Sequence, residues 1–239
     1  MCYEDAVKPK KKYHPDETAL VSDFFGHKTS GIFVEVGAND PKYRSQTWHL
    51  EEKGWSGVLV EPQSRLCEAL RAVRHRSQVF QVACAAPNHP EEAVLFLAER
   101  HGESGLGKDQ LGVNYVGEET VKLLTLDEIL RQAGNPEIDF ISIDVEGLQL
   151  PVLQGFGLAH HRPKLLIIED RFQSCQTHLH LCRQGYRLVR RSNDLNNWYV
   201  PRESSFRANL ATRLKLFRFV WLGTPFRRFK FWWRGRKNF

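Results

Sequence analysis

Short apolar runs of strand length recur along this chain and alternate with segments of helical pattern. A run that is apolar throughout predicts a strand buried on both faces, as in a parallel sheet covered by helices. The predicted strands cover residues 31–37, 57–61, 79–84, 93–98, 138–144 and 164–170. The predicted helices cover residues 16–25, 47–53, 64–74, 125–134, 148–156 and 171–184. This alternation predicts a doubly wound, mostly parallel α/β sheet.

Two further segments refine this plan. Residues 186–190 and 198–200 flank an Asn- and Asp-rich turn, which predicts an antiparallel hairpin at the end of the sheet. Residues 99–118 are rich in glycine and polar residues and show no periodicity. A loop of that length in a compact domain is usually functional or disordered.

Composition places the chain among globular proteins of one domain. Its 239 residues suffice for a full core. No apolar run is long enough to span a membrane, and the first residues do not resemble a signal segment. The five cysteines are odd in number and scattered, which favours reduced thiols and a cytoplasmic location.

The net charge of +6 is unevenly distributed. From Ser204 to the end there are ten Lys and Arg residues and no Asp or Glu, so residues 1–203 carry a net charge of −4. We therefore predict a domain over residues 1–203, with a core at about 14–201, and a basic aromatic tail over 204–239.

The tail has the pattern of an amphipathic helix. Leu210, Leu214, Phe217 and Trp221 follow helical spacing, and Pro225 is predicted to end that helix. Aromatic residues favour the membrane interface and cations favour anionic headgroups. The tail is thus predicted to hold the protein peripherally at the inner face of a membrane. Single-stranded nucleic acid is a less favoured partner, and packing on the body or on a partner protein is the third interpretation.

Acidic residues stand at the carboxyl ends of three predicted strands, where ligands bind in such sheets. They are Glu61, Asp144, Glu146, Glu169 and Asp170. Clustered acids repel one another unless a cation, hydrogen-bond donors or a proton offsets the charge. Three alternatives could account for the clustered negative charge. The positive end of a cofactor or a divalent Mg²⁺ or Mn²⁺ ion could balance it, or one acid could serve as a general base that takes up a proton. Alternatively, Asp170 caps a helix and Glu146 is solvated.

The turn after the first strand carries the ligand signal. It has a single glycine, Gly37, followed by Asp40, whereas a dinucleotide-binding turn has the pattern G-x-G-x-x-G. Glu61 follows Gly37 at roughly the distance expected of a ribose-binding acid, about 20 residues. The pattern suits a ligand with an adenosine end and a positive end, as in S-adenosylmethionine. A buried strand with a tight turn and a surface acid is the alternative.

Five segments together resemble the FkbM family of S-adenosylmethionine-dependent methyltransferases. They are residues 31–40, 50–62, 124–130, 138–147 and 162–169. The resemblance covers roughly residues 14–190 and implies a class I methyltransferase (Rossmann-like) fold. It also implies O-methylation, often of sugars in glycans or of natural-product hydroxyls.

The resemblance assigns roles to individual positions. The residues implied in cofactor binding are Glu35, Gly37, Asn39, Asp40, Glu61, Pro62, Ala83 and Asp144. Within that set, Glu61 would hold the ribose and Asp144 would lie beside the methyl group. The residues predicted to act in catalysis, on the basis of the acids at the strand ends, are Asp144, Glu146 and Glu169. By looser analogy with catechol O-methyltransferase, Asp144, Glu169 and Asp170 stand where that enzyme holds magnesium.

One departure from the family pattern opens a second function class. Pro41 stands where similar proteins have glycine, and proline cannot adopt φ > 0. The leading hypothesis is O-methylation of a sugar hydroxyl in a cell-envelope or lipid-linked glycan, with a small natural product as another acceptor. The second is a non-catalytic module that tethers a glycan-assembly complex to membrane. Base N-methylation is disfavoured, since the strand ending at Asp144 lacks a following Pro-Pro.

Cys175, His178, His180 and Cys182 have spacing similar to that of a metal cluster. A single helix cannot wrap four ligands around one ion. Cys175, Leu179 and Cys182 are instead predicted to form a buried helix face.

Overall fold

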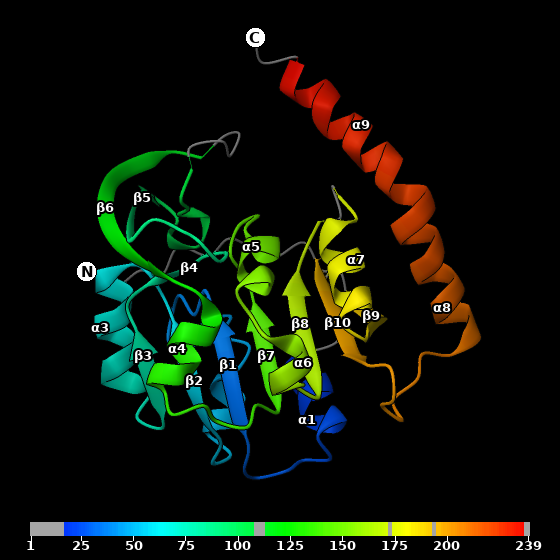
Figure 1. The fold of residues 1–239 in the computed structure, drawn as a ribbon, viewed down its shortest axis with the longest axis horizontal. Helices are drawn as coiled ribbons and strands as arrows, with labels where there is room; N and C mark the ends of the chain where they lie inside the picture. Colours follow the sequence, from blue (N-terminus) through cyan, green and yellow to red (C-terminus); the bar gives the residue numbers. More distant parts are fainter. Residues whose placement is uncertain (1–16, 108–112, 172–173, 193–194, 237–239) are drawn as a thin grey trace.

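The computed structural model describes residues 17–107, 113–171, 174–192 and 195–236. Within them, a seven-stranded sheet has the order β3-β2-β1-β7-β8-β10-β9 (Figure 1). The strands are β1 Ile32–Val36, β2 Ser56–Val60, β3 Ser77–Phe80, β7 Phe140–Ile143, β8 Leu165–Glu169, β9 Tyr186–Ser192 and β10 Asn196–Pro201. The first five run parallel, and β10 pairs antiparallel with β8 and β9. The predicted doubly wound sheet with a terminal hairpin is confirmed.

Seven helices of this part of the chain cover the sheet. They are α1 Glu17–Phe24, α2 Trp48–Glu51, α3 Ser64–Val73, α4 Leu126–Gln132, α5 Gln149–Gln154, α6 Leu158–His161 and α7 Gln176–Arg183. Successive strand residues point to opposite faces. Val34 and Ile141 therefore pack under α4 to α7, while Phe33 and Phe140 pack under α1 to α3. Burial on both faces explains why these strands are apolar throughout.

A second sheet corrects two sequence predictions. It has the order β4-β6-β5, with β4 Ala83–Cys84, β5 Glu92–Ala98 and β6 Tyr115–Leu124. The predicted strand 79–84 is divided, since its first part belongs to β3 and its last two residues to β4. The predicted loop 99–118 contains the helical turn η1 (His101–Glu103) and the start of β6. Exposed and less exposed residues alternate along β6, so it lacks the continuous apolar run that identified the other strands.

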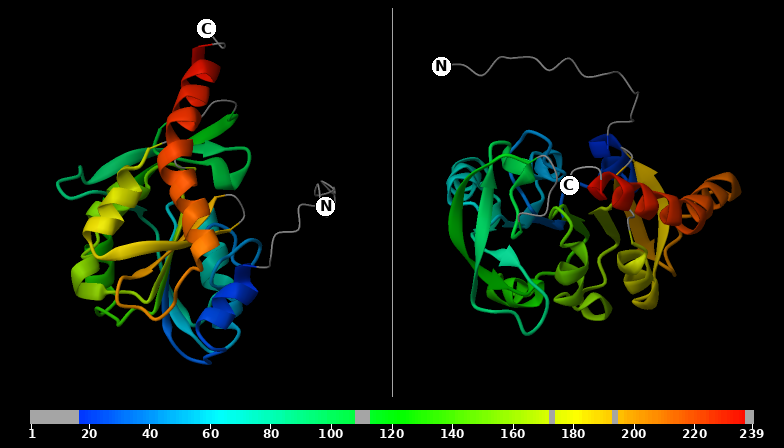
Figure 2. Two further views of the ribbon diagram at one scale, coloured as in Figure 1. Left: turned by 90° about the vertical axis from the view of Figure 1, so that its right-hand side faces the viewer. Right: turned by 90° about the horizontal axis from the view of Figure 1, so that it is seen from above.

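The chain ends in a continuous helix built of three segments. They are α8 Leu210–Phe217, the π-helical segment η2 Arg218–Leu222 and α9 Gly223–Arg236. α8 lies beside the edge strand β9, and α9 extends beyond the body (Figures 1 and 2). The helix does not end at Pro225, contrary to prediction. That residue falls in the first turn of α9, where the altered hydrogen-bond pattern of the preceding π segment accommodates the missing N–H.

Two observations complete the description of the helices. Within the described residues, no helix combines the length and apolar composition needed to cross a bilayer.

The predicted buried face of α7 is wrong, because Thr177 and Leu181 are its buried residues. Cys175 is partly exposed, and its thiol contacts the backbone carbonyl of Val220 in the terminal helix.

A buried ion-pair cluster fastens the loop that follows β1. Arg74 at the end of α3 is 1 % exposed and donates from Nε to Glu51 at 2.7 Å. Its two other nitrogens donate to the Pro41 carbonyl at 3.2 Å and to the Thr47 hydroxyl at 2.7 Å. The carboxylate of Glu35 in β1 lies 3.8 Å from the same guanidinium. One cation therefore holds three separate segments against the edge of the sheet.

We expect Arg74→Met to destabilise the protein by about 3–5 kcal/mol, because it leaves buried carboxylates without their cation. Urea denaturation of the two proteins measures the difference. The matched control is Arg65→Met on the exposed face of α3, which should change stability by no more than about 0.5 kcal/mol. A loss as small as that of the control would show that the cluster does not hold the loop.

Candidate active site

Parallel strands deliver acidic side chains to one edge of the sheet. The strands β1, β7 and β8 point toward the same edge (Figure 1). Glu61 follows β2, Asp144 follows β7, and Glu169 is the last residue of β8. The structure thus brings together acids that are far apart in sequence.

The ends of β1 and β7 touch at the backbone. Gly37 has φ +80°, and a β-carbon built on it would lie 1.9 Å from the carbonyl oxygen of Asp144. The amide of Gly37 donates to Val60 at 2.9 Å, and the amide of Asp144 donates to Val36 at 3.0 Å. A side chain at residue 37 would force the two turns apart, so glycine is required there.

Glu61 is held by the turn that follows Gly37. Its carboxylate accepts from the amides of Asn39 and Gln63, each at 2.9 Å. The side chain is 3 % exposed, and burial raises its pKa to about 7 in spite of these two donors and a further hydrogen bond from the Gln63 side chain. A carboxylate offers about four lone-pair directions, so a hydroxyl donor can still bind to it.

The turn accommodates the unusual proline. Positive φ values occur at Gly37, Asn39 and Arg44, and Pro41 is not among such residues. Asp40 closes its own turn, since its carboxylate accepts from the amides of Lys42 at 2.9 Å and Tyr43 at 2.6 Å. The sequence departure at residue 41 therefore requires no strained backbone.

Three more residues implied in cofactor binding are partly or fully buried. Glu35 accepts from the hydroxyls of Ser45 and Thr47 and belongs to the Arg74 cluster. Ala83 is buried in the apolar core of the second sheet. Pro62 is half-buried directly after Glu61. Glu35 thus acts first on the shape of the loop, and its contact with a ligand stays a prediction.

Asp144 lies in a crowded but water-accessible position at the end of β7. The residue as a whole is exposed, yet the pKa of its carboxyl group is raised to about 8. The largest cause is desolvation by the surrounding protein, followed by the negative charges of Glu169 and Glu146 and a hydrogen bond with Glu169. Two neighbouring carboxyl groups that cannot both ionise easily share a proton in this way.

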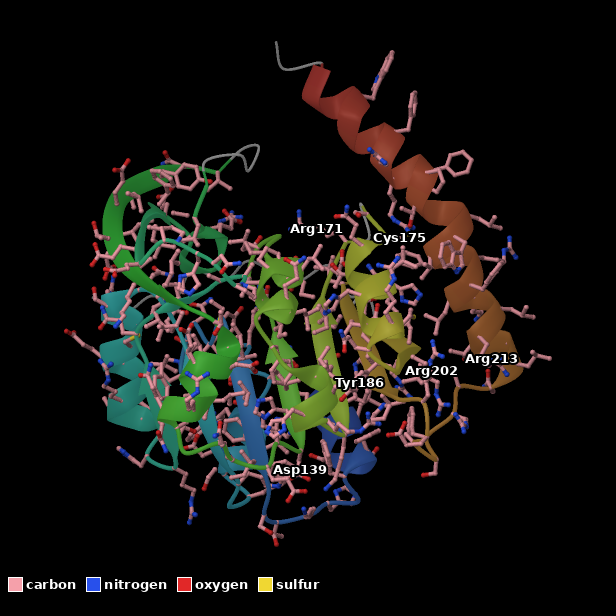
Figure 3. All side chains as sticks on the ribbon, in the orientation of Figure 1. Asp139, Arg171, Cys175, Tyr186, Arg202 and Arg213 are labelled. Atoms are coloured by element: carbon pink, nitrogen blue, oxygen red, sulfur yellow. The ribbon has the colours of Figure 1, made fainter. Side chains whose placement is uncertain are left out.

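The turn after Asp144 is sharply bent. Glu146 has φ 43° and Gly147 has φ 99°. Burial and the charge of Glu169 raise the pKa of Glu146, and the nearby Arg171 partly offsets this. Figure 3 shows Arg171 at the edge where β7 and β8 end. A non-glycine residue in the left-handed region at such an edge is typical of a functional site.

Two acidic residues near this site, Glu103 and Glu119, were not identified from the sequence. A β-carbon added at Gly102 of η1 would lie 3.1 Å from the side-chain amide of Asn39, and the charge of Glu103 acts on Glu146. Glu119 of β6 accepts from the amide of Ser64 at 3.1 Å and raises the pKa of Glu61. Both belong to the second sheet and its loop, whose place over the site has no local sequence signal.

The predicted metal set is not assembled. No group of three His, Cys, Asp or Glu residues in the described part of the chain is arranged to hold an ion. Asp144 and Glu169 are neighbours. The backbone carbonyl of Asp170 instead accepts hydrogen bonds from the side chains of Arg191 and Asn197. The Asp170 carboxylate charge acts on Arg227 of the terminal helix. The backbone of Asp170 prolongs the contact of β8 with the segment leading into β10, since its amide donates to the Leu195 carbonyl at 3.0 Å. Asp170 does not cap a helix, since α7 begins at Gln176.

Comparisons with known proteins show the family of this chain. A family model described as the methyltransferase FkbM domain matches residues 35–188, more than half of the chain. The solved structure of methyltransferase FkbM from Methylobacillus flagellatus is 16 % identical with a TM-score of 0.49, and the match covers 72 % of this chain and 44 % of that one. The precorrin-6y C5,15-methyltransferase from Geobacter metallireducens is 12 % identical with a TM-score of 0.41, covering 81 % and 90 %.

A third solved structure, the METTL16 methyltransferase domain, is 13 % identical with a TM-score of 0.43, covering 77 % of this chain and 64 % of that one. This chain therefore spans less than two thirds of the FkbM and METTL16 chains that it matches. No curated protein matches the sequence.

We expect Asp144→Asn to be more stable than the wild type at about pH 9, and by a larger margin than at about pH 5. The folded-state pKa of Asp144 is about 8, above its ordinary value of 3.8. The stability contributed by the protonated form is therefore lost as the pH rises toward and through 8, and asparagine cannot ionise. Urea midpoints at the two pH values measure this, with Glu68→Gln on the exposed face of α3 as control. A margin that does not grow with pH would contradict the raised pKa.

Proposed function

We propose that this chain, which belongs to the FkbM methyltransferase domain family, transfers a methyl group from S-adenosylmethionine to a hydroxyl of a sugar. The acceptor is a cell-envelope or lipid-linked glycan. The observation that carries the proposal is the water-accessible Asp144 beside Glu169, with its pKa raised to about 8, next to the Gly37 turn.

The residues at this edge fit the cofactor. S-adenosylmethionine supplies an electrophilic methyl group on a positively charged sulfur. Gly37 has no side chain and leaves its backbone approachable, and the Glu61 carboxylate can accept a hydrogen bond from a ribose hydroxyl. The negative charges of Glu169 and Glu146, which act on Asp144, favour a positive ligand group at this edge.

The acidic rim favours a neutral, hydroxyl-rich acceptor. Besides Asp144 and Glu169, the charges of Glu146 and Glu103 act on this rim. Carboxylates accept hydrogen bonds from hydroxyl groups and repel anionic acceptors such as phosphates and carboxylates. A sugar hydroxyl satisfies both conditions.

Asp144 is suited to remove the proton of the attacking hydroxyl. An aliphatic hydroxyl is almost fully protonated at neutral pH, and a positioned base contributes about 10²–10⁴-fold. A carboxylate whose pKa lies near 8 is a stronger base than an ordinary one. Desolvation raises that basicity most, and the charges of Glu169 and Glu146 raise it further. Holding both substrates at one edge contributes further, up to roughly 7–11 kcal/mol.

The observation that suggested a non-catalytic tethering module no longer supports it. That alternative rested on Pro41, which takes an ordinary conformation and whose carbonyl accepts from Arg74. Calorimetry with S-adenosylmethionine separates the two functions, because a wild-type protein that binds none cannot be the proposed enzyme.

We expect the wild-type protein to transfer labelled methyl groups from S-adenosylmethionine to envelope glycans. Asp144→Asn should lower turnover by about 10²–10⁴-fold with little change in cofactor affinity, because it removes the base. The wild-type kcat/KM, which reports the free enzyme, should rise with pH and level off above about 8, where Asp144 is ionised. Glu68→Gln is the control for an acid lost elsewhere. Wild-type turnover by Asp144→Asn would remove that residue from the chemistry, and labelling of small metabolites alone would redirect the acceptor.

We expect Glu61→Ala to weaken S-adenosylmethionine binding by about tenfold or more, the loss expected for hydrogen bonds to a charged group. Calorimetry measures the affinity, and circular dichroism checks folding, since the substitution also leaves the amides of Asn39 and Gln63 without their acceptor. Asp144→Asn serves as the comparison within the same site. Unchanged affinity in a folded Glu61→Ala protein would disprove the ribose contact.

A further inference from the structure

An exposed apolar stripe runs along the terminal helix. Leu210, Leu214 and Phe217 lie on its first part, Leu222 and Phe226 on its second, and all five are between 55 % and 77 % exposed. Single exposed apolar residues are ordinary on protein surfaces, whereas a continuous stripe marks an interaction site.

The π-helical segment keeps the stripe on one face. Successive members are separated by four, three, five and four residues. Intervals of three and four return to the same face of an α-helix. The interval of five, from Phe217 to Leu222, coincides with η2, where the i→i+5 pattern brings residues five apart into line. The stripe therefore passes Pro225 without a break. Phe229 and Trp233, which stack on each other at 6.2 Å, extend it.

The opposite side of the helix is fixed to the body. Leu216, Val220 and Thr224 recur at intervals of four and are buried. The thiol of Cys175 lies 3.8 Å from the Val220 carbonyl and 3.6 Å from the Thr224 hydroxyl. Figure 3 shows Cys175 between α7 and the helix, with ring side chains of α9 directed away from the body. The apolar stripe thus faces outward in a defined orientation.

A second set of contacts reinforces this orientation. The guanidinium groups of Arg191 and Arg227 lie 4.2 Å and 3.9 Å from the ring centre of Phe219. Arg191 belongs to β9, so the helix is clamped to the edge strand of the sheet at this point.

Charge identifies the occupant of the stripe. No acid occurs from Ser204 to the end, where ten Lys and Arg residues stand, and Arg213, Arg218 and Arg228 are exposed. A second copy of this helix would bring like charges together. Single-stranded nucleic acid stacks on aromatic rings, a use that Leu210 and Leu214 cannot serve. Anionic lipid meets both features, because headgroups attract the cations and the acyl boundary takes leucine and aromatic side chains.

We propose that the outer face of the α8–α9 helix docks on the surface of an anionic lipid bilayer. The helix lies in the interface, with its apolar stripe in the lipid and its buried face on the body. α9 extends past the edge of the sheet at which β1, β7 and β8 end (Figures 1 and 2). The bilayer then lies close to the edge that carries Glu61 and Asp144. Binding to lipid is independent of methyl transfer, so the two proposals fail separately.

Flotation of the full chain with lipid vesicles tests this surface. The probes are vesicles of phosphatidylglycerol and phosphatidylcholine in equal parts, vesicles of phosphatidylcholine alone, and a single-stranded oligonucleotide without lipid. The test variant carries Phe217→Asp and Phe226→Asp, and the matched control carries Phe217→Leu and Phe226→Leu at the same exposed positions. Circular dichroism checks that both variants keep their helix content.

We expect the wild type and the leucine variant to float with the anionic vesicles and to bind phosphatidylcholine alone much less. The aspartate variant should bind the anionic vesicles about tenfold or more weakly per replaced phenylalanine, the loss expected when an apolar side chain leaves lipid. The proposal is overturned if the wild type does not float, if the aspartate variant floats as well as the wild type, or if the oligonucleotide binds and the vesicles do not. If the aspartate variant does not fold, unequal flotation of the wild type with the two kinds of vesicle decides.

Discussion

The approach of two backbone turns at Gly37 and Asp144 underlies the candidate active site. The contact leaves no room for a β-carbon at residue 37, since it would lie 1.9 Å from the Asp144 carbonyl oxygen. Because the turns are this close, the acids that follow β2 and β7 share one edge with the Asn39 turn between them. The buried Arg74 cluster acts one layer below and fixes the loop that continues from that turn. Backbone packing therefore decides where the charges lie.

Gathering acids at one edge lowers stability, and the proposed function explains this arrangement. Desolvation and mutual repulsion raise the pKa values of Glu61 and Asp144 to about 7 and about 8. Both shifts reduce stability as the pH rises, and the left-handed conformation of Glu146 adds backbone strain. An arrangement that favours stability alone would separate or replace these side chains. Their presence at one edge fits a site that binds a positive cofactor and takes a proton from a hydroxyl.

The terminal helix solves a different physical problem. The edge strand β9 exposes backbone groups that could pair with another chain, and α8 lies alongside it. Covering that edge uses one face of the helix and leaves the apolar stripe outside. The π segment reconciles these demands, because it keeps the buried and the apolar faces in phase across Pro225. A helix that protects the sheet can in this way also present a lipid-binding face.

The sequence alone determined the parallel core and the acids at its strand ends, because burial on both faces produces continuous apolar runs and a strand end is a local signal. It also pointed to the family, through segments such as residues 31–40 and 138–147. The second sheet was less visible, since the alternating pattern of β6 carries a weaker signal than an apolar run. Only the tertiary structure decided that Glu103 and Glu119 act on the site, that the Asp170 backbone bonds to Asn197 of β10, and that Pro41 needs no special backbone. Each of these depends on contacts between segments distant in the chain, and neither periodicity nor spacing carries that information.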